Sequence, residues 1–341
     1  MFYKCPKCKK VWQYPIEKCP DCFLGLERLE SKETKVIGIS KVSISSIFHK
    51  KVPYFVLVLE DKSGNRWVQK SEREYKIGDE FRIEKATNKN TVAIWRVKYD
   101  FLEAIEKVIE ILGSLSLNSN SKVLILPTLV SASHSYFRDN TSPEFLDAIL
   151  KFISQVGIKP ANVKVCAQSF DEIEIGQKAQ KSGLLDVCQK NRVLAVDLAQ
   201  RSFIKKGDLE ISEEIFKTDF ILNLPILKAG KASATENLFF LLKKENYLSQ
   251  KYLYSEKEIF EKLGKNLPEY LTIAEADKIQ DKEGFVQYLG LVFSSFNSQN
   301  LDRVFSEIVK EEKLPEILKE IKIEEIPVLG RKIGEVAFYG N

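Results

Sequence analysis

The sequence contains none of the short motifs that mark several large enzyme classes. It has no GxGxxG, no GxxxxGK[ST], no HExxH and no GxSxG. Local signals are therefore missing for dinucleotide binding, for a P-loop, for a zinc-protease helix and for a hydrolase nucleophile. A ferredoxin-type run of four closely spaced cysteines is also missing. No catalytic motif can be read directly from the chain.

Long apolar runs are absent as well. The start Met1–Cys5 has no apolar stretch behind it of the kind found in a secretory signal, and no later run approaches the roughly 18 apolar residues of a membrane span. Four of the six cysteines stand in two CxxC pairs, as is typical of proteins in a reducing compartment. We therefore expect a cytoplasmic protein that does not span a membrane.

Size and charge indicate several folded domains with a basic front. The chain has 341 residues, of which 44% are hydrophobic and 29% charged, so it can build a core in each of two or three domains. Residues 1–90 contain 19 Lys and Arg against 12 Asp and Glu, whereas the remainder contains 33 against 36. A basic front suggests an anionic partner.

Two cysteine pairs predict a metal site at the beginning of the chain. Cys5-Pro-Lys-Cys8 and Cys19-Pro-Asp-Cys22 are ten residues apart, a spacing at which two turns supply a tetrahedral set of thiolates. Zinc is the usual metal of such closed sites, and iron is the alternative because it accepts the same ligands. Disulfide-bonded or incidental cysteines are the remaining interpretation. Four protein ligands leave no open position for a substrate, so we expect a structural zinc ribbon over residues 1–30.

The following segment, residues 31–90, predicts an antiparallel OB-like barrel of about five strands. Short runs rich in β-branched and aromatic residues alternate with turn signals; they are Lys35–Ser40, Tyr54–Glu60, Arg66–Gln69 and Glu80–Glu84. Rings and cations also occur together here, a composition that binds single-stranded nucleic acid by base stacking; they are Phe48, His49, Lys50, Lys51, Tyr54, Trp67, Lys70, Arg73 and Tyr75. Core packing is the competing interpretation for Tyr54, Phe55 and Trp67.

Residues 91–341 predict an α/β domain with a mostly parallel sheet, because strand-like and helix-like segments alternate. The expected strands are Lys122–Pro127, Asn162–Cys166, Arg192–Asp197, Phe220–Pro225, Leu271–Ala274 and Gly290–Ser294. The expected helices are Phe101–Leu112, Pro143–Val156, Ile175–Ser182 and Leu301–Ile308.

Ligands of α/β sheets usually bind beyond the carboxyl ends of the strands. The segments that follow the predicted strands contain polar residues suited to a small anionic or carbonyl ligand, and each of these residues also has a surface or capping role as its alternative; they are His134, Arg138, Asp139, Lys228, Lys231, Asn237, Glu275 and Asp277. His134 precedes Ser135, but no triad order frames them, so a hydrolase is not predicted.

The front of the chain resembles the rubredoxin-like zinc ribbon plus OB-fold of domain-of-unknown-function family 35. The resemblance lies in the four cysteines, the strand Tyr54–Glu60 and the turn Ile77–Glu80. That family often accompanies thiolase-type acyl-CoA enzymes without being catalytic itself. The resemblance therefore implies a protein or acyl-CoA contact.

From about Val92 to the end, the chain resembles domain-of-unknown-function family 362, an uncharacterised α/β family whose members often carry ferredoxin-type clusters. The matching segments are Val92–Arg96, Leu126–Val130, Thr141–Glu144, Asn223–Lys228, Thr235–Phe239 and Leu301–Val304. The family's usual Lys-Pro-Asn, Lys-Thr-His and Lys-Asn stand here as Leu126-Pro127-Thr128, Lys228-Ala229-Gly230 and Glu236-Asn237. The resemblance singles out Lys228, Asn237 and Asp302 as ligand-binding positions, with His134 as a further candidate.

Three functions fit these observations. The first is a zinc-binding protein whose α/β domain binds a small anionic or carbonyl ligand, either as an enzyme or as a degenerate enzyme. The second is an OB-fold protein that binds single-stranded nucleic acid, with an affinity that falls as salt rises. The third is an adaptor whose ribbon and barrel dock an acyl-CoA-metabolising or other protein.

Overall fold

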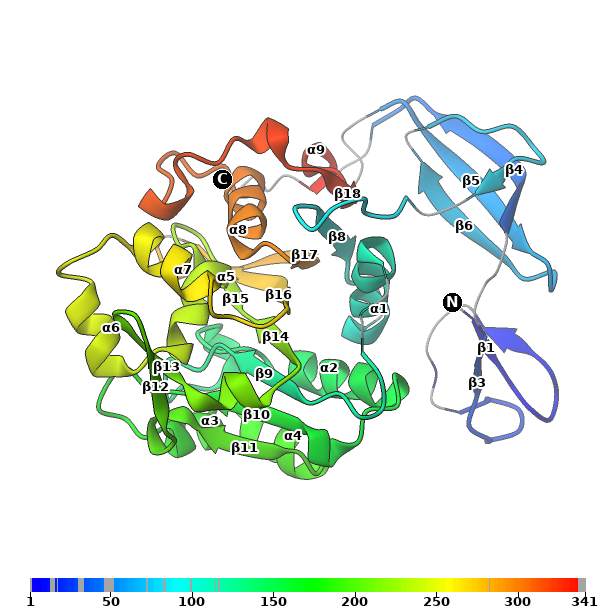
Figure 1. The fold of residues 1–341 in the computed structure, drawn as a ribbon. Helices are drawn as coiled ribbons and strands as arrows, with labels where there is room; N and C mark the ends of the chain where they lie inside the picture. The colour runs from blue at the N-terminus through cyan, green and yellow to red at the C-terminus, as the bar shows by residue number, and fades with distance from the viewer. Residues whose placement is uncertain are drawn as a thin grey trace. The chain divides into compact units, whose positions relative to one another are not determined.

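The structure is a computed structural model in which the chain forms two compact units, residues 1–84 and 85–341. It describes residues 2–12, 16, 18–29, 34–45, 52–71, 73–81, 84–98, 100–113, 115, 117–281 and 283–336. Figure 1 shows the small unit in blue and the α/β unit in the remaining colours. The expected division of the first unit near residue 30 stays a prediction.

The first unit begins with a three-stranded antiparallel sheet around the cysteines. Strands β1 (Phe2–Lys4), β2 (Val11–Trp12) and β3 (Glu27–Leu29) lie in the order β2-β1-β3. The strands are two or three residues long. Such a sheet is too small to bury a hydrophobic core of its own.

A curled four-stranded antiparallel sheet completes this unit. Strands β4 (Thr34–Val42), β5 (Tyr54–Asp61), β6 (Arg66–Ser71) and β7 (Glu80–Phe81) lie in the order β6-β5-β4-β7. Residues of β5 alternate between half-buried and buried, as expected for a strand with one face on a core. Four strands are found in the described residues, where about five were expected, so the sheet there forms a half-barrel.

The α/β unit is built on a nine-stranded mixed sheet that is mostly parallel, which confirms the predicted fold class. Its order is β11-β10-β9-β14-β16-β17-β8-β18, with β15 pairing with β16. The strands are β8 (Val92–Arg96), β9 (Val123–Pro127), β10 (Val163–Ala167), β11 (Leu194–Asp197), β14 (Phe220–Leu224), β15 (Ile226–Lys228), β16 (Tyr270–Gln280), β17 (Val286–Ser295) and β18 (Val328–Gly330).

Strand β17 runs antiparallel to both β16 and β8, whereas β9, β10, β11, β14 and β16 are joined by parallel pairings. β15 follows β14 after Pro225 and runs beside β16, with Lys228 opposite Gln280. Lys228 therefore lies beyond the carboxyl end of β14, at the edge where parallel sheets usually hold ligands.

Helices cover both faces of this sheet (Figure 1). On one face α1 (Phe101–Leu112) packs against α2 (Pro143–Gln155), which in turn contacts α4 (Leu184–Lys190). On the other face, α8 (Ser298–Ile308) and α5 (Ser233–Asn237) contribute to the apolar clusters formed with the strands. The predicted helices 101–112 and 143–156 are confirmed, and Asp100 and Ser142 cap their first turns.

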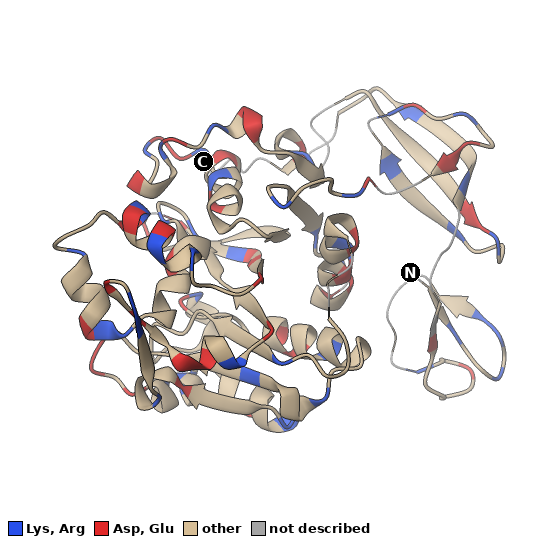
Figure 2. Ribbon diagram, in the orientation of Figure 1, with Lys and Arg blue, Asp and Glu red and all other residues tan. Residues whose placement is uncertain are grey.

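Several further elements were not predicted. They comprise the hairpin β12 (Phe203–Lys206) and β13 (Leu209–Ser212), helices α6 (Lys244–Gln250), α7 (Glu256–Gly264) and α9 (Ile333–Val336), and several 3₁₀ turns. The predicted helix 175–182 is present as α3 (Ile175–Lys181). Lysines and arginines are interspersed with acidic residues over this unit (Figure 2).

Candidate metal centre and polar cluster

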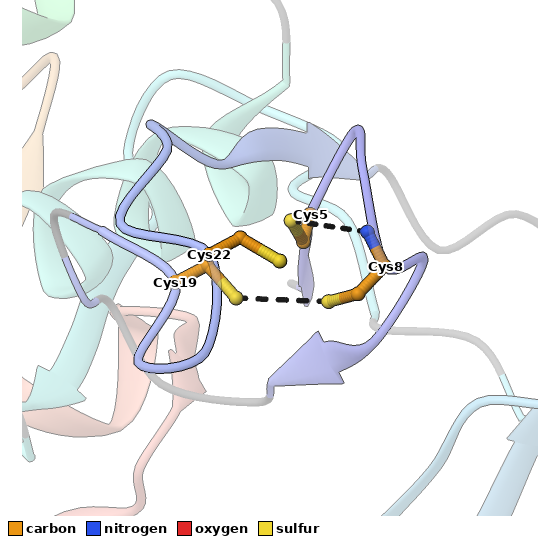
Figure 3. A group of neighbouring side chains, drawn as sticks. All are labelled: Cys5, Cys8, Cys19 and Cys22. Atoms are coloured by element: carbon orange, nitrogen blue, oxygen red, sulfur yellow. Dashed lines mark hydrogen bonds between the residues drawn. The ribbon is translucent and has the colours of Figure 1, made fainter.

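The four cysteines of the CxxC pairs converge on one point of the first unit. Their sulfur atoms all lie within 4.8 Å of one another, and the Sγ atoms of Cys8 and Cys19 are 3.6 Å apart (Figure 3). Cys5 and Cys19 are fully buried. Among the described residues, no other group of three or more His, Cys, Asp or Glu is placed to hold a metal ion.

Each pair forms the same turn. The backbone N–H of Lys9 donates to the carbonyl of Cys5 (3.0 Å), and the N–H of Phe23 donates to the carbonyl of Cys19 (2.8 Å). Lys9 and Phe23 both have φ values in the left-handed region, 62° and 56°, which non-glycine residues rarely adopt. The two turns are thus equivalent, and each presents its two sulfurs to the same centre.

The distances fit a tetrahedral metal. Zinc–sulfur bonds of about 2.3 Å place neighbouring sulfurs of a tetrahedron about 3.8 Å apart, close to the Cys8–Cys19 separation. Burial and the neighbouring thiols raise the pKa of Cys22 to about 12. For Cys5, hydrogen bonds from the N–H groups of Cys8 and Lys7 outweigh burial and lower the pKa to about 7. Four thiolates can share this space only if a cation neutralises them.

These four residues could hold one metal ion, with no position left for a substrate. Their chemistry suits zinc and iron equally, because both accept tetrahedral thiolate ligands. On the outside of the site, the ammonium of Lys10 lies 2.6 Å from the carboxylate of Asp21. This ion pair links the first turn to the second.

A second polar cluster lies at the carboxyl end of the α/β sheet and contains Lys228. Its ammonium donates to Oδ1 of Asp139 over 2.7 Å, and its side chain is 15% exposed. The hydroxyls of Ser131 and Ser133 lie 2.5 Å apart, and each is 3.4 Å from Oδ2 of Asp139. Of these partners the sequence indicated Asp139 only as one of many polar residues, and it gave no signal for the two serines.

The loop that carries Asp139 is held by its neighbours. The side-chain oxygen of Asn140 accepts from the backbone N–H groups of Val130 (2.9 Å) and Ser131 (3.1 Å). The hydroxyl of Thr141 donates to the carbonyl of Leu224 at 2.7 Å. Asn140 and Thr141 are fully buried. The loop between β9 and α2 is therefore fixed at both of its ends.

A buried ion pair holds the same loop to β16. The guanidinium of Arg138 donates to the carboxylate of Glu275, whose oxygens also accept from the hydroxyl of Ser142 (2.7 Å) and its backbone N–H (2.9 Å). Glu275 is fully buried. Arg138 has φ of 59°, a strained conformation that persists only where surrounding contacts enforce it. Glu275 thus has a positioning role that its place in the sequence did not reveal.

A buried lysine supports the loop from the other side. The ammonium of Lys178 donates to the carbonyl of Val130 and to the carboxylate of Asp171, both at 2.8 Å. Lys178 is 1% exposed. Burial raises the pKa of Asp171, but the hydrogen bonds from Lys178 and Ser169 outweigh it and lower that pKa to about 2.

Asn237 and Asp302, the other two positions implied by the resemblance, are buried away from solvent. The amide of Asn237 donates to the carbonyl of Leu126 (2.9 Å) and to Oδ1 of Asn223 (2.8 Å). The carboxylate of Asp302 accepts from the backbone N–H groups of Ala234 and Thr235, both at 2.8 Å. Burial raises the pKa of Asp302 to about 8 against these bonds. In the structure their contacts connect α5 to the sheet and to α8.

His134 is exposed at the start of the 3₁₀ turn Ser135–Phe137, where its Nδ1 accepts from the backbone N–H of Tyr136 at 3.1 Å. It belongs to the same loop as Asp139. The structure therefore brings Lys228 and the loop of His134 to one edge of the sheet, whereas the side chains of Asn237 and Asp302 point into the protein interior.

The aromatic residues of the first unit divide between core and surface. Phe55 and Trp67 pack with the apolar cluster of the curled sheet, and Phe2 meets the Trp67 ring edge-on at 5.3 Å. Tyr54 lies under the ammonium of Lys70 at 4.6 Å. Phe48, His49, Lys50 and Lys51 lie outside the described residues.

The sequence of the α/β unit was compared with families of known proteins. Residues 123–235 match the family described as Domain of unknown function (DUF362). The DUF362 match runs from β9 to α5, so it includes Asp139 and Lys228 and ends before Asn237 and Asp302. No curated protein matches the chain. The resemblance of the front to family 35 stays a prediction.

No helix among the described residues combines the length and the apolar character that crossing a lipid bilayer requires. The cytoplasmic location inferred from the sequence remains a prediction.

Proposed function

We propose that this is a zinc-binding protein whose α/β unit binds a small anionic or carbonyl-bearing ligand beside Lys228. The observation that carries the proposal is the position of the Lys228 ammonium, which is 15% exposed at the carboxyl end of the parallel strands. Sites of this kind lie at that edge in open α/β sheets. A lysine there supplies hydrogen-bond donors to an anionic or carbonyl oxygen.

The surrounding loop supports this assignment. It is anchored by buried residues on both sides of Asp139, and it includes a residue with strained backbone, Arg138. Rigid placement of polar side chains lowers the entropy lost when a ligand is bound. Strained conformations are concentrated at binding sites for the same reason.

The binding test compares Lys228→Ala with the unaltered protein in thermal unfolding, using phosphate, acetate, glycolate, acetone and hydroxyacetone as probes. A ligand that binds only the folded state raises the unfolding midpoint. Lys228→Ala should abolish the increase while the free protein still folds. Lys262→Ala, which removes a surface lysine paired with Asp208 at 3.0 Å, is the matched control. Equal shifts in both variants would refute the assignment.

Zinc is proposed because it is the commonest metal of closed four-cysteine structural sites. Elemental analysis of purified protein should give one zinc per chain. A tetrathiolate iron centre would instead be coloured, and an iron content of one per chain would replace zinc in the proposal.

A protein contact through residues 1–90 is a second function that we propose for the first unit. Phe23 and Leu24, at the second cysteine turn, are 76% and 44% exposed, and exposed apolar residues often mark contact sites. A pull-down with the whole protein should recover a partner that Phe23→Asp loses and that Lys9→Asp, at the equivalent position of the first turn, retains. Recovery of the same proteins by all three would contradict it.

Single-stranded nucleic acid is the alternative partner of the basic front. Binding of a single strand by base stacking needs exposed aromatic rings, whereas Trp67 packs against the core of the curled sheet. An anisotropy titration with single-stranded RNA at several salt concentrations tests this function. Binding that weakens steeply with salt would support it, and its absence would remove it.

A further inference from the structure

The arrangement of charges around Lys228 narrows the choice between an anionic and a carbonyl ligand. The ammonium of Lys228 is already 2.7 Å from Oδ1 of Asp139. A second anion placed beside Lys228 would be attracted by the lysine and repelled by the aspartate over a similar distance. The pair as a whole therefore gives little electrostatic attraction to a simple anion.

The backbone that carries this aspartate is held in place, because its neighbours in the chain are fixed. Arg138 is tied to Glu275 on β16, and Asn140 is bonded to the backbone of Val130 and Ser131. Asp139 stands between these two anchored residues. A ligand at this edge of the sheet must therefore accommodate the carboxylate as well as the ammonium.

Both charged groups retain hydrogen-bonding capacity. An ammonium has three donors, and the described residues give Lys228 one side-chain partner, Asp139. Among the described residues, Oδ2 of Asp139 has two contacts, both 3.4 Å long, to Ser131 and Ser133. Hydrogen bonds between a hydroxyl and a carboxylate are normally about 2.5–2.7 Å long. Oδ2 can thus accept a stronger bond from a ligand.

We infer that the ligand of this site carries a hydroxyl group next to a carbonyl or carboxylate oxygen. The hydroxyl donates to Oδ2 of Asp139, and the adjacent oxygen accepts from Nζ of Lys228. Both bonds involve a charged protein group, so they are stronger than bonds between neutral groups. The inference rests on the proposed function of Lys228 and adds Asp139 as the residue that selects hydroxylated compounds over simple anions.

Two matched pairs of probes test the selection in the unaltered protein. Glycolate differs from acetate, and hydroxyacetone from acetone, by one hydroxyl group. Dissociation constants are derived from the concentration dependence of the thermal midpoint. Each hydroxylated probe should bind about tenfold or more tightly than its counterpart, the effect expected for one charge-assisted hydrogen bond. Phosphate should bind more weakly than glycolate.

The variant Asp139→Asn should remove this preference. It removes the negative charge and leaves Lys228 without an ionic partner, so phosphate and acetate should bind more tightly than in the unaltered protein. Glycolate should lose its advantage over acetate, because an amide oxygen is a weaker acceptor than a carboxylate. Asp208→Asn, which removes the partner of Lys262, is the control and should leave every dissociation constant unchanged.

The outcomes separate this inference from the proposed function. Equal affinity for glycolate, acetate and phosphate, all lost in Lys228→Ala, would overturn the inference and keep the proposed function. Absence of binding by every probe, or binding that Lys228→Ala leaves unchanged, would overturn both. The comparison of probes in the unaltered protein decides the question even if Asp139→Asn does not fold.

Discussion

The cysteine turns and the α/β unit differ in the interactions that stabilise their folds. Among the described residues up to Leu29, the buried apolar side chains are those of Cys5, Cys19 and Phe2. The α/β unit instead buries extended apolar clusters on its sheet. A metal ion held by the four cysteines would replace the core in the first case, because so few residues cannot bury enough apolar surface. The fold of the cysteine turns should therefore depend on metal–sulfur bonds, and the fold of the α/β unit on many apolar contacts.

Metal removal should have the largest effect on stability, and it should unfold the cysteine turns without unfolding the α/β unit. Structural zinc contributes about 10–16 kcal/mol to the folding of small modules at neutral pH. Cys19→Ser or a chelator should abolish amide dispersion for residues 2–29 in NMR spectra and leave the unfolding of the α/β unit unchanged. Cys166→Ser, at a buried cysteine outside the cluster, should retain the metal. Loss of structure in both units would contradict the comparison.

Breaking the buried ion pair of the α/β unit should have the next largest effect. Arg138→Met leaves the fully buried Glu275 without its cation, and loss of one partner of such a pair costs about 3–5 kcal/mol. Chemical denaturation of the whole protein measures the change. Lys151→Met, which removes an exposed lysine paired with Asp147 while Lys190 stays beside that carboxylate, should cost less than about 1 kcal/mol. Similar values for the two variants would show that Arg138 does not anchor the loop.

The ion pair of Lys178 and Asp171 should make the stability of the α/β unit depend on pH. The pKa of Asp171 is lowered to about 2 in the folded state, against an ordinary 3.8. Its contribution is therefore complete above about pH 4 and is lost as the pH falls through about 2. Asp171→Asn should destabilise the unit by about 1–3 kcal/mol at neutral pH, because the buried Lys178 loses its charged partner.

The same variant should flatten the fall in stability between pH 4 and pH 2, as measured by denaturation at several pH values. Asp186→Asn, at an exposed residue of α4, should leave that fall unchanged. If Asp171→Asn keeps the acid dependence of the unaltered protein, the pairing does not contribute to stability.

The smallest expected effect lies in the packing between the cysteine-bearing sheet and the curled sheet. Phe2 and Trp67 meet edge-on at 5.3 Å, and aromatic pairs contribute about 0.5–1.5 kcal/mol beyond their burial. A double-mutant cycle of Phe2→Ala and Trp67→Ala on the metal-bound protein should give a coupling of this size. Phe2→Ala and Val68→Ala, at a residue that is 60% exposed, should be additive within about 0.5 kcal/mol.

Features governed by neighbours in the chain were predictable. The cysteine spacing indicated the metal site, because each turn needs only four consecutive residues to orient two sulfurs. Helices α1 and α2 followed from the helix-like periodicity of their segments, and in the structure Asp100 and Ser142 cap their first turns. The hairpin of β12 and β13 was missed because its residues Lys205 and Lys206 are exposed and polar, which removes the pattern of a half-buried strand.

The candidate site was only partly predictable. The resemblance singled out Lys228, but its partner Asp139 lies 89 residues earlier in the chain, and no local pattern connects the two. Asn237 and Asp302 were placed with Lys228 as ligand-binding positions, whereas the structure gives them buried contacts within the protein. The order of parallel strands decides which loops meet, and that order depends on long-range packing.

By itself, the sequence determined the four-cysteine cluster, the curled sheet that follows it and the α/β class of the larger unit. Each of these depends on spacing or periodicity over a few residues. The tertiary structure alone decided that a carboxylate stands beside Lys228 and that buried side chains anchor the loop that carries it. Charges far apart in the chain acquire their partners only when the strands that carry them are assembled, so the character of the site was not visible before the fold.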